Sequence, residues 1–128
     1  MRPRYADLFR ALKDPDLARA DAAYDALLFD RGEALPDLHE AYRGFKKDAT
    51  LRFYAVQLMA FSGDARAIPL VMEALSDPDP QVRAEACRGL EDLGARSALN
   101  ALRARTEDLD GNVREAALEA LSALDSTE

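Results

Sequence analysis

The sequence repeats itself with a period of 31 residues, and this repeat constrains the fold more than any other feature. Residues 77–94 read DPDPQVRAEACRGLEDLG, and residues 108–125 read DLDGNVREAALEALSALD. Glycines, aspartates, arginines and apolar residues recur with the same spacing, at Gly32, Gly63 and Gly94, at Asp48, Asp79 and Asp110, at Arg52, Arg83 and Arg114, and at Leu28, Met59, Leu90 and Leu121. A fixed period of this length is typical of a stack of similar structural units.

Each repeat contains an amphipathic helix that begins after an aspartate and ends near a glycine. Val82, Ala86 and Leu90 have the i, i+4, i+8 spacing that places apolar side chains on one helical stripe. The stripe recurs in the neighbouring repeats, as Leu51, Ala55 and Met59 and as Val113, Ala117 and Leu121. Aspartates positioned as N-caps precede the stripes, at Asp48, Asp79 and Asp110. Glycines positioned to end helices in the left-handed conformation follow, at Gly32, Gly63 and Gly94.

A second, shorter helix is predicted between each glycine and the next aspartate. The segments concerned are YADLFRAL (5–12), ALPDLHEAY (34–42), RAIPLVMEAL (66–75) and SALNALRAR (97–105). The sequence therefore predicts an all-α fold of eight short helices without strands. It forms one domain over residues 1–128, with repeats at roughly 3–31, 32–62, 63–93 and 94–125. A single helix pair cannot bury its apolar stripe, so neighbouring pairs must stack.

The two most similar segments resemble a known repeat family. DPDPQVRAEACRGL and DLDGNVREAALEAL are similar to the short HEAT-like repeats of bilin lyase subunits and of many bacterial proteins, in which an aspartate lies six residues before an arginine. The pairs that carry this resemblance are Asp77 with Arg83 and Asp108 with Arg114. The resemblance implies a right-handed α-solenoid of about four helix pairs. It also implies that these four residues form a structural ladder, in which an acidic turn side chain meets an arginine of a neighbouring helix.

The first two repeats depart from this pattern. Lys46 occupies the position at which the pattern has an aspartate. In the first repeat two alignments are open, because either Arg19 or Asp21 can take the position of the ladder arginine. The direction in which residues of the first helix pair face is therefore open as well.

The sequence offers little for catalysis or metal binding. His39, the only histidine, forms a His-Glu dyad with Glu40, similar to the dyads that form the metal centre of the HEAT-like deoxyhypusine hydroxylases. A metal site needs several convergent donors, and one dyad does not supply them. Cys87 lies on an apolar stripe and is expected to be a small buried hydrophobic residue. We therefore expect no catalytic residue, no metal, no cofactor and no enzyme activity.

Charge and hydropathy narrow the expected location and partners. No apolar run approaches the roughly 20 residues that a membrane span requires, and no secretory signal is apparent. Together with the single cysteine, this predicts a cytoplasmic protein with no membrane partner. The net charge of −7 makes nucleic acid an unfavourable partner. The small basic clusters are expected to be solvated, at Arg43, Lys46 and Lys47 and at Arg103 and Arg105.

A curved stack of helix pairs exposes a concave surface, which the resemblance implies is lined by the second helix of each pair. We expect a partner to bind there, through Tyr24, Phe53, Tyr54, Gln57, Phe61, Glu85, Arg88 and Glu119. Ala116 belongs to the same set of positions, and Asp21 and Asp25 are the further candidates in the first repeat. Aromatic side chains are good anchors in interfaces, and the acidic residues favour a partner with a basic surface.

These observations predict a non-enzymatic protein–protein interaction module or scaffold. One alternative is an immunity-type inhibitor of a basic toxin. Another is a bilin-lyase-like subunit. The sequence leaves open the identity of the partner, the oligomeric state, and whether the concave face or an end of the solenoid binds it.

Overall fold

The structure, a computed structural model, describes residues 1–125 and contains only helices in that range. The α-helices are α1 (Pro3–Ala11), α2 (Leu17–Phe29), α3 (Leu35–Gly44), α4 (Ala49–Phe61), α5 (Ala67–Glu73), α6 (Pro80–Asp92), α7 (Leu99–Arg105) and α8 (Gly111–Asp125). Short 3₁₀ segments extend α5 at its end (η1, Ala74–Ser76) and precede α7 (η2, Arg96–Ala98).

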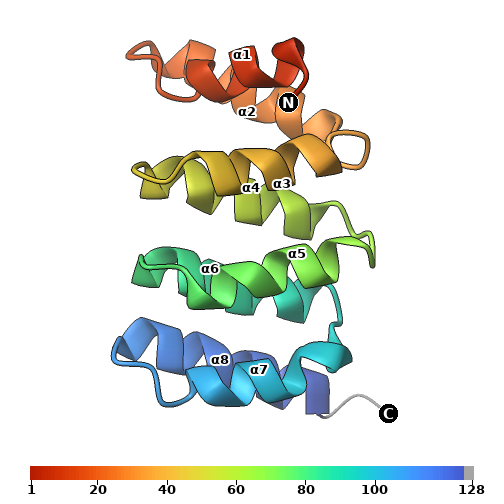
Figure 1. Cartoon of the computed structure of the whole chain (residues 1–128), viewed down its shortest axis with the longest axis vertical. Helices are drawn as coiled ribbons and strands as arrows, with labels where there is room; N and C mark the ends of the chain where they lie inside the picture. Colours follow the sequence, from red (N-terminus) through yellow and green to blue (C-terminus); the bar gives the residue numbers. More distant parts are fainter. Residues whose placement is uncertain (126–128) are drawn as a thin grey trace.

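The helices form antiparallel pairs that stack along the long axis of the molecule, from α1–α2 at one end to α7–α8 at the other (Figure 1). The predicted all-α solenoid is therefore confirmed. The second helices of the later repeats pack closely on one another, α4 on α6 and α6 on α8, whereas α2 contacts α4 at few residues and α1, α3, α5 and α7 make few contacts among themselves. The closer spacing of the second helices places them on the inner side of the curved stack. None of the helices in residues 1–125 has the length and apolar character needed to span a membrane.

Aspartates begin all four second helices. Asp16 accepts a hydrogen bond from Ala18 N, and Asp48 accepts one from Leu51 N. Asp79 and Asp110 likewise accept from backbone N–H groups two and three residues ahead. These bonds satisfy N–H groups that have no partner within the helix. The sequence analysis missed Asp16, because it lies 32 rather than 31 residues before Asp48.

This N-cap settles the alignment of the first repeat. The ladder arginines lie four residues after the N-cap, as Arg52 does after Asp48. The corresponding residue in α2 is Ala20, so neither Arg19 nor Asp21 takes the arginine position. Arg19 instead approaches the N-cap residue of its own helix, with its Nε 3.7 Å from Asp16 Oδ2.

Two of the three expected helix-ending glycines have the left-handed conformation. Gly63 and Gly94 have φ angles of 64° and 63°, which a residue with a side chain adopts only with strain. Gly32 does not share this conformation, and the expectation for it was wrong. The reason is local: α2 ends at Phe29 with Asp30 as its C-cap, so Gly32 lies within the following turn.

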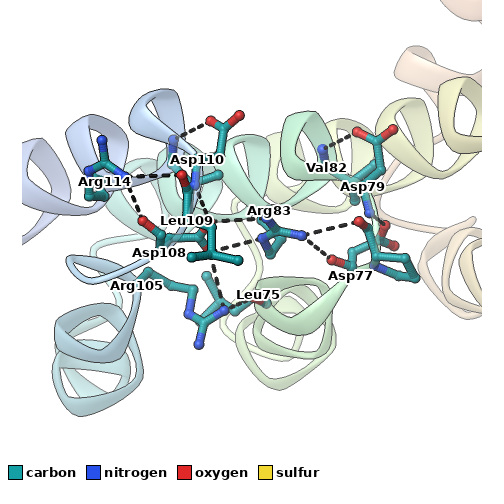
Figure 2. Close-up of polar contacts among 12 residues, drawn as sticks. Leu75, Asp77, Asp79, Val82, Arg83, Arg105, Asp108, Leu109, Asp110 and Arg114 are labelled. Atoms are coloured by element: carbon teal, nitrogen blue, oxygen red, sulfur yellow. Dashed lines mark hydrogen bonds and ion pairs between the residues drawn. The ribbon is translucent and has the colours of Figure 1, made fainter.

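A ladder of arginine–aspartate pairs joins the later repeats. Arg83 donates two hydrogen bonds to the carboxylate of Asp108 in the next repeat, over 2.9 and 3.0 Å (Figure 2). Its third nitrogen donates to the carbonyl oxygens of Asp77 and Pro78 in its own turn. Arg83 therefore ties its own interhelical turn to the acid of the following repeat.

The preceding rung is more deeply buried. Arg52 donates two hydrogen bonds to Asp77, over 2.9 and 3.1 Å, and the side chains are 9% and 1% exposed. Tyr42 also donates its hydroxyl to Asp77 over 2.8 Å. Burial alone would raise the pKa of Asp77, but the hydrogen bonds from Arg52, Asp79 N and Tyr42 outweigh it and hold that pKa below its ordinary value.

The ladder stops at both ends of the stack. Arg114 of α8 donates to the carbonyl oxygens of Asp108 and Leu109 and forms no ion pair with a carboxylate within residues 1–125 (Figure 2). Between the first two repeats both partners of a rung are replaced, by Ala20 and Lys46.

Other contacts hold the first helix pair. Lys13 Nζ lies 3.2 Å from Asp48 Oδ2, and the rings of Phe9 and Phe45 lie 5.5 Å apart. Arg2 donates to the carboxylate of Asp37 through both its backbone and its side chain. The first repeat is thus joined to the stack by a different set of contacts from the others.

Candidate partner-binding groove

The second helices carry three adjoining hollows along the inner side of the stack. The N-terminal hollow lies between α2 and α4 and measures about 550 Å³. The C-terminal hollow, between α6 and α8, is of similar size. A smaller one of about 280 Å³ lies between them and shares Tyr54 with the first and Phe53 and Gln81 with the second. The shared residues make the three hollows one continuous groove.

Three aromatic rings follow one another across the groove floor. The rings of Tyr24 and Tyr54 meet edge to face at 5.6 Å, and Phe53 meets Tyr54 at 6.0 Å. Phe61, the last residue of α4, lines the same N-terminal hollow and is 42% exposed. Aromatic side chains bury a large area at little cost in conformational entropy, so they are suited to contact a partner.

A chain of hydrogen bonds crosses the groove beneath this surface and links three repeats. Tyr24 donates its hydroxyl to the Gln57 amide oxygen, and the Gln57 amide nitrogen donates to Glu85 over 3.2 Å. Arg88 Nε donates to the other carboxylate oxygen of Glu85 over 3.0 Å. Burial and, next, the negative charge of Glu85 raise the pKa of Tyr24 to about 12, so its hydroxyl remains a donor at neutral pH.

The sequence analysis expected Glu85 to be a surface residue, and this expectation was wrong. It is 8% exposed, and both of its carboxylate oxygens are occupied by Gln57 and Arg88. Ala116, one repeat later, is 3% exposed. Both residues lie against the neighbouring second helix. Each follows the first apolar residue of its helical stripe by three positions, and a residue at that position still faces partly toward the next repeat.

The remaining expected residues line the groove. Tyr24, Tyr54, Gln57 and Phe61 border the N-terminal hollow. Phe53, Arg88 and Glu119 border the C-terminal hollow. The structure thus brings seven of the eight expected residues to one surface, in two groups.

The sequence analysis missed part of the lining. The groove residues of α4, α6 and α8 follow an i, i+3, i+7 pattern with the 31-residue period, as Thr50, Phe53 and Gln57, as Gln81, Ala84 and Arg88, and as Asn112, Glu115 and Glu119. Applied from the N-cap of α2, the pattern reaches Asp21 and Asp25. The sequence analysis had selected Phe53 and Asp21 among these positions, but it did not select Thr50, Gln81, Ala84, Asn112 or Glu115.

Carboxylates border both large hollows without cationic partners. Asp21 and Asp25 border the N-terminal hollow, and Glu115 and Glu119 border the C-terminal one. No ion pair within residues 1–125 involves any of these four. The single basic residue of the lining, Arg88, is already paired with Glu85. The groove is therefore negatively charged.

The histidine and the cysteine lie outside the groove. His39 Nε2 lies 3.0 Å from a carboxylate oxygen of Glu73, which Arg43 also binds. The described part of the chain contains no cluster of three or more histidine, cysteine, aspartate or glutamate side chains that could hold a metal ion. The His39–Glu40 dyad is therefore not part of such a cluster within these residues. Cys87 is fully buried, and this burial raises the pKa of its thiol to about 11.

Comparison with known protein families finds a match for the later repeats of the chain. Residues 68–128 match the model of a family described as HEAT repeats. This part of the chain is therefore similar to HEAT repeats. The resemblance seen in the sequence is thereby confirmed, and it rests on the last two helix pairs, where the repeats are most alike. No curated protein matches the sequence.

Two solved structures are similar in fold to nearly the whole chain. Human deoxyhypusine hydroxylase in complex with glycerol is 26% identical, with a TM-score of 0.73 over 96% of this chain and 44% of the other. The complex of CpcE and CpcF of phycocyanin lyase from Nostoc sp. PCC7120 is 18% identical, with a TM-score of 0.52 over 98% of this chain and 66% of the other. This chain therefore spans less than two thirds of either protein.

One expectation is overturned by this comparison. The sequence analysis predicted that the protein is not an enzyme, but a HEAT-repeat protein similar to 96% of this chain is a hydroxylase. The absence of a recognisable catalytic motif was the only ground for that prediction. HEAT repeats of this kind occur in enzymes, so the prediction is not supported.

Proposed function

We propose that this chain is a HEAT-repeat binding module whose concave groove holds a segment of another protein. The observation that carries the proposal is the continuity of the groove over α2, α4, α6 and α8, with partly buried aromatic rings along its floor and the exposed Phe61 at one end. Neighbouring packed helices lie about 8–10 Å apart, so a groove over four of them is about 25–30 Å long. A groove of this length suits an extended polypeptide better than a compact small molecule, which pockets usually enclose.

The comparisons support a protein partner at the level of the fold. The structure of CpcE and CpcF is a complex of protein chains, and this chain shares its fold. Under the proposal, the aromatic residues supply contact area and the polar chain from Tyr24 to Arg88 keeps the groove floor rigid. A rigid floor lowers the entropy lost on binding.

A second candidate is a subunit or domain of an enzyme, in which the groove binds a protein substrate. The similarity to human deoxyhypusine hydroxylase, of whose chain this one spans 44%, favours it. The bilin-lyase-like version predicts a bound tetrapyrrole, which absorbance of the purified protein in the visible range would reveal. The inhibitor version predicts tight one-to-one binding to a basic toxin.

The proposal is tested by affinity capture followed by calorimetry on the captured protein. The groove variant Asp25→Lys/Glu119→Lys reverses one charge in each large hollow. The control Asp7→Lys/Glu107→Lys makes the same change in net charge at exposed residues outside the groove. We expect the purified partner to bind the wild type and the control equally and to lose at least about tenfold in affinity for the groove variant.

Far-ultraviolet circular dichroism establishes that both variants remain helical. A partner that binds the groove variant as tightly as the wild type would show that the groove is not the binding surface. Equal weakening by both variants would show that only the net charge of the protein is recognised.

A further inference from the structure

We infer that the segment bound in the groove is basic and extended, with arginine or lysine side chains at two positions about five or six residues apart. This inference rests on the proposed function and specifies the chemistry of the partner. The N-terminal hollow combines three aromatic rings, and the C-terminal hollow one, with carboxylates that have no cationic partner within residues 1–125. Each hollow is placed to receive one of the two basic groups.

The N-terminal hollow has the features of a site for a cationic side chain. Asp21 and Asp25 are exposed on α2 and have no ion-pair partner in the described chain. The rings of Tyr24, Tyr54 and Phe61 border the same hollow. A guanidinium or ammonium group is attracted to an aromatic face and to a carboxylate together, and arginine stacks on such rings especially well.

The C-terminal hollow repeats this combination. Glu115 and Glu119 are exposed on α8 and unpaired within residues 1–125, and Phe53 closes the end of the hollow nearer α4. Arg88 does not neutralise them, because its guanidinium is held by Glu85. A second basic side chain of the partner would replace the missing counter-charge.

The floor between the hollows offers no comparable site. Thr50 and Gln81, which border the middle hollow, are neutral, and Asp79 is engaged as the N-cap of α6. Gln57 and Glu85 bind each other, so their polar groups are already satisfied. The negative charge available to a partner is thus divided between the two ends.

The separation of the hollows sets the spacing in the partner. The N-terminal hollow is centred between α2 and α4 and the C-terminal one between α6 and α8, which is two helix-to-helix steps away. Two steps of about 8–10 Å make about 16–20 Å. An extended chain rises about 3.3 Å per residue, so five or six residues span this distance.

Two synthetic peptides of the same composition test the inference against the full chain by fluorescence polarisation. One carries two arginine pairs whose centres are about six residues apart, and the other carries the four arginines as one block, with glycine and serine elsewhere. We expect the spaced peptide to bind at least about fivefold more tightly, because only it reaches both hollows at once.

Isosteric variants assign the preference to the hollows. Asp21→Asn/Asp25→Asn and Glu115→Gln/Glu119→Gln should each reduce the affinity for the spaced peptide to that for the block peptide. The control Glu107→Gln should keep the full preference, since Glu107 borders neither hollow.

Equal binding of the two peptides to the wild type, or no binding of either, would overturn the inference. The proposed function fails separately, when a captured native partner is insensitive to the groove variant. A native partner that requires the groove but has no basic segment would disprove this inference and leave the proposed function standing.

Discussion

The buried rung between Arg52 and Asp77 makes replacement of its aspartate the most informative perturbation of this fold. In Asp77→Ala, Arg52 loses two hydrogen bonds of 2.9 and 3.1 Å and the one carboxylate that it pairs with in residues 1–125. The Tyr42 hydroxyl and Asp79 N lose an acceptor as well. The Arg52 side chain is only 9% exposed, so water cannot fully replace these contacts.

The expected cost follows from this burial. Removing one partner of a buried ion pair costs about 3–5 kcal/mol, because the other charge remains in a poorly solvated place. The total stability of a domain is about 5–15 kcal/mol, so the variant should lose a large fraction of it. With a urea dependence of about 2 kcal/mol per molar, the unfolding midpoint should fall by about 2 M.

Arg114→Ala is the matched control for the ladder. Arg114 makes the same bonds to its own turn, to the carbonyl oxygens of Asp108 and Leu109, but pairs with no carboxylate in the described chain. Its loss should cost only about 1 kcal/mol. Urea unfolding followed by circular dichroism measures both variants. Equal losses, or a loss below about 1.5 kcal/mol for Asp77→Ala, would refute the argument that the buried rung holds the repeats together.

Three further predictions use the same stability and reactivity measurements. Gly89→Ala should destabilise by about 1–2 kcal/mol despite the better helix propensity of alanine, because its Cβ would lie 2.8 Å from Ala60 Cβ; a more stable variant would contradict this close approach. The Cys87 thiol, buried and with a pKa raised to about 11, should react with a disulfide reagent at least about 100-fold more slowly in the native protein than in urea, and equal rates would contradict its burial. The folded-state pKa values of Asp77 and Asp108 lie below the ordinary 3.8, so their stabilising contribution is complete above that pH and is lost as the pH falls through the lowered values. The urea midpoint of the wild type should therefore decrease when the pH is lowered below about 4. The midpoint of Asp77→Ala should decrease less over the same pH range.

The repeat itself was predictable because helix starts and helix stripes are local properties. An aspartate before an apolar i, i+4, i+8 stripe defines the start and the buried face of a helix without reference to the rest of the chain. This is why the predicted caps at Asp48, Asp79 and Asp110 accept the expected backbone hydrogen bonds. The left-handed glycines at Gly63 and Gly94 follow from the same local logic.

Long-range placement was less predictable. Glu85 was assigned to the surface because helical spacing gives the direction of a side chain but not how closely the next helix approaches. In the structure α6 packs between α4 and α8, and Glu85 lies where Gln57 reaches it. The first repeat was misaligned for a related reason: its N-cap, Asp16, lies one residue off the period, and only the helix start in the structure reveals this.

The sequence alone determined that the chain is a stack of helix pairs, because a 31-residue period with one apolar stripe per unit can bury its apolar surface only by stacking. The tertiary structure decided which charges are neutralised. Asp77 and Asp108 meet arginines 25 residues away, whereas Asp21, Asp25, Glu115 and Glu119 meet none within the described chain. All are acidic residues on or beside the second helices, and the sequence does not distinguish them. The difference arises from the stacking of the repeats, which brings an arginine of one repeat to the turn aspartate of the next and leaves the hollows between the second helices open.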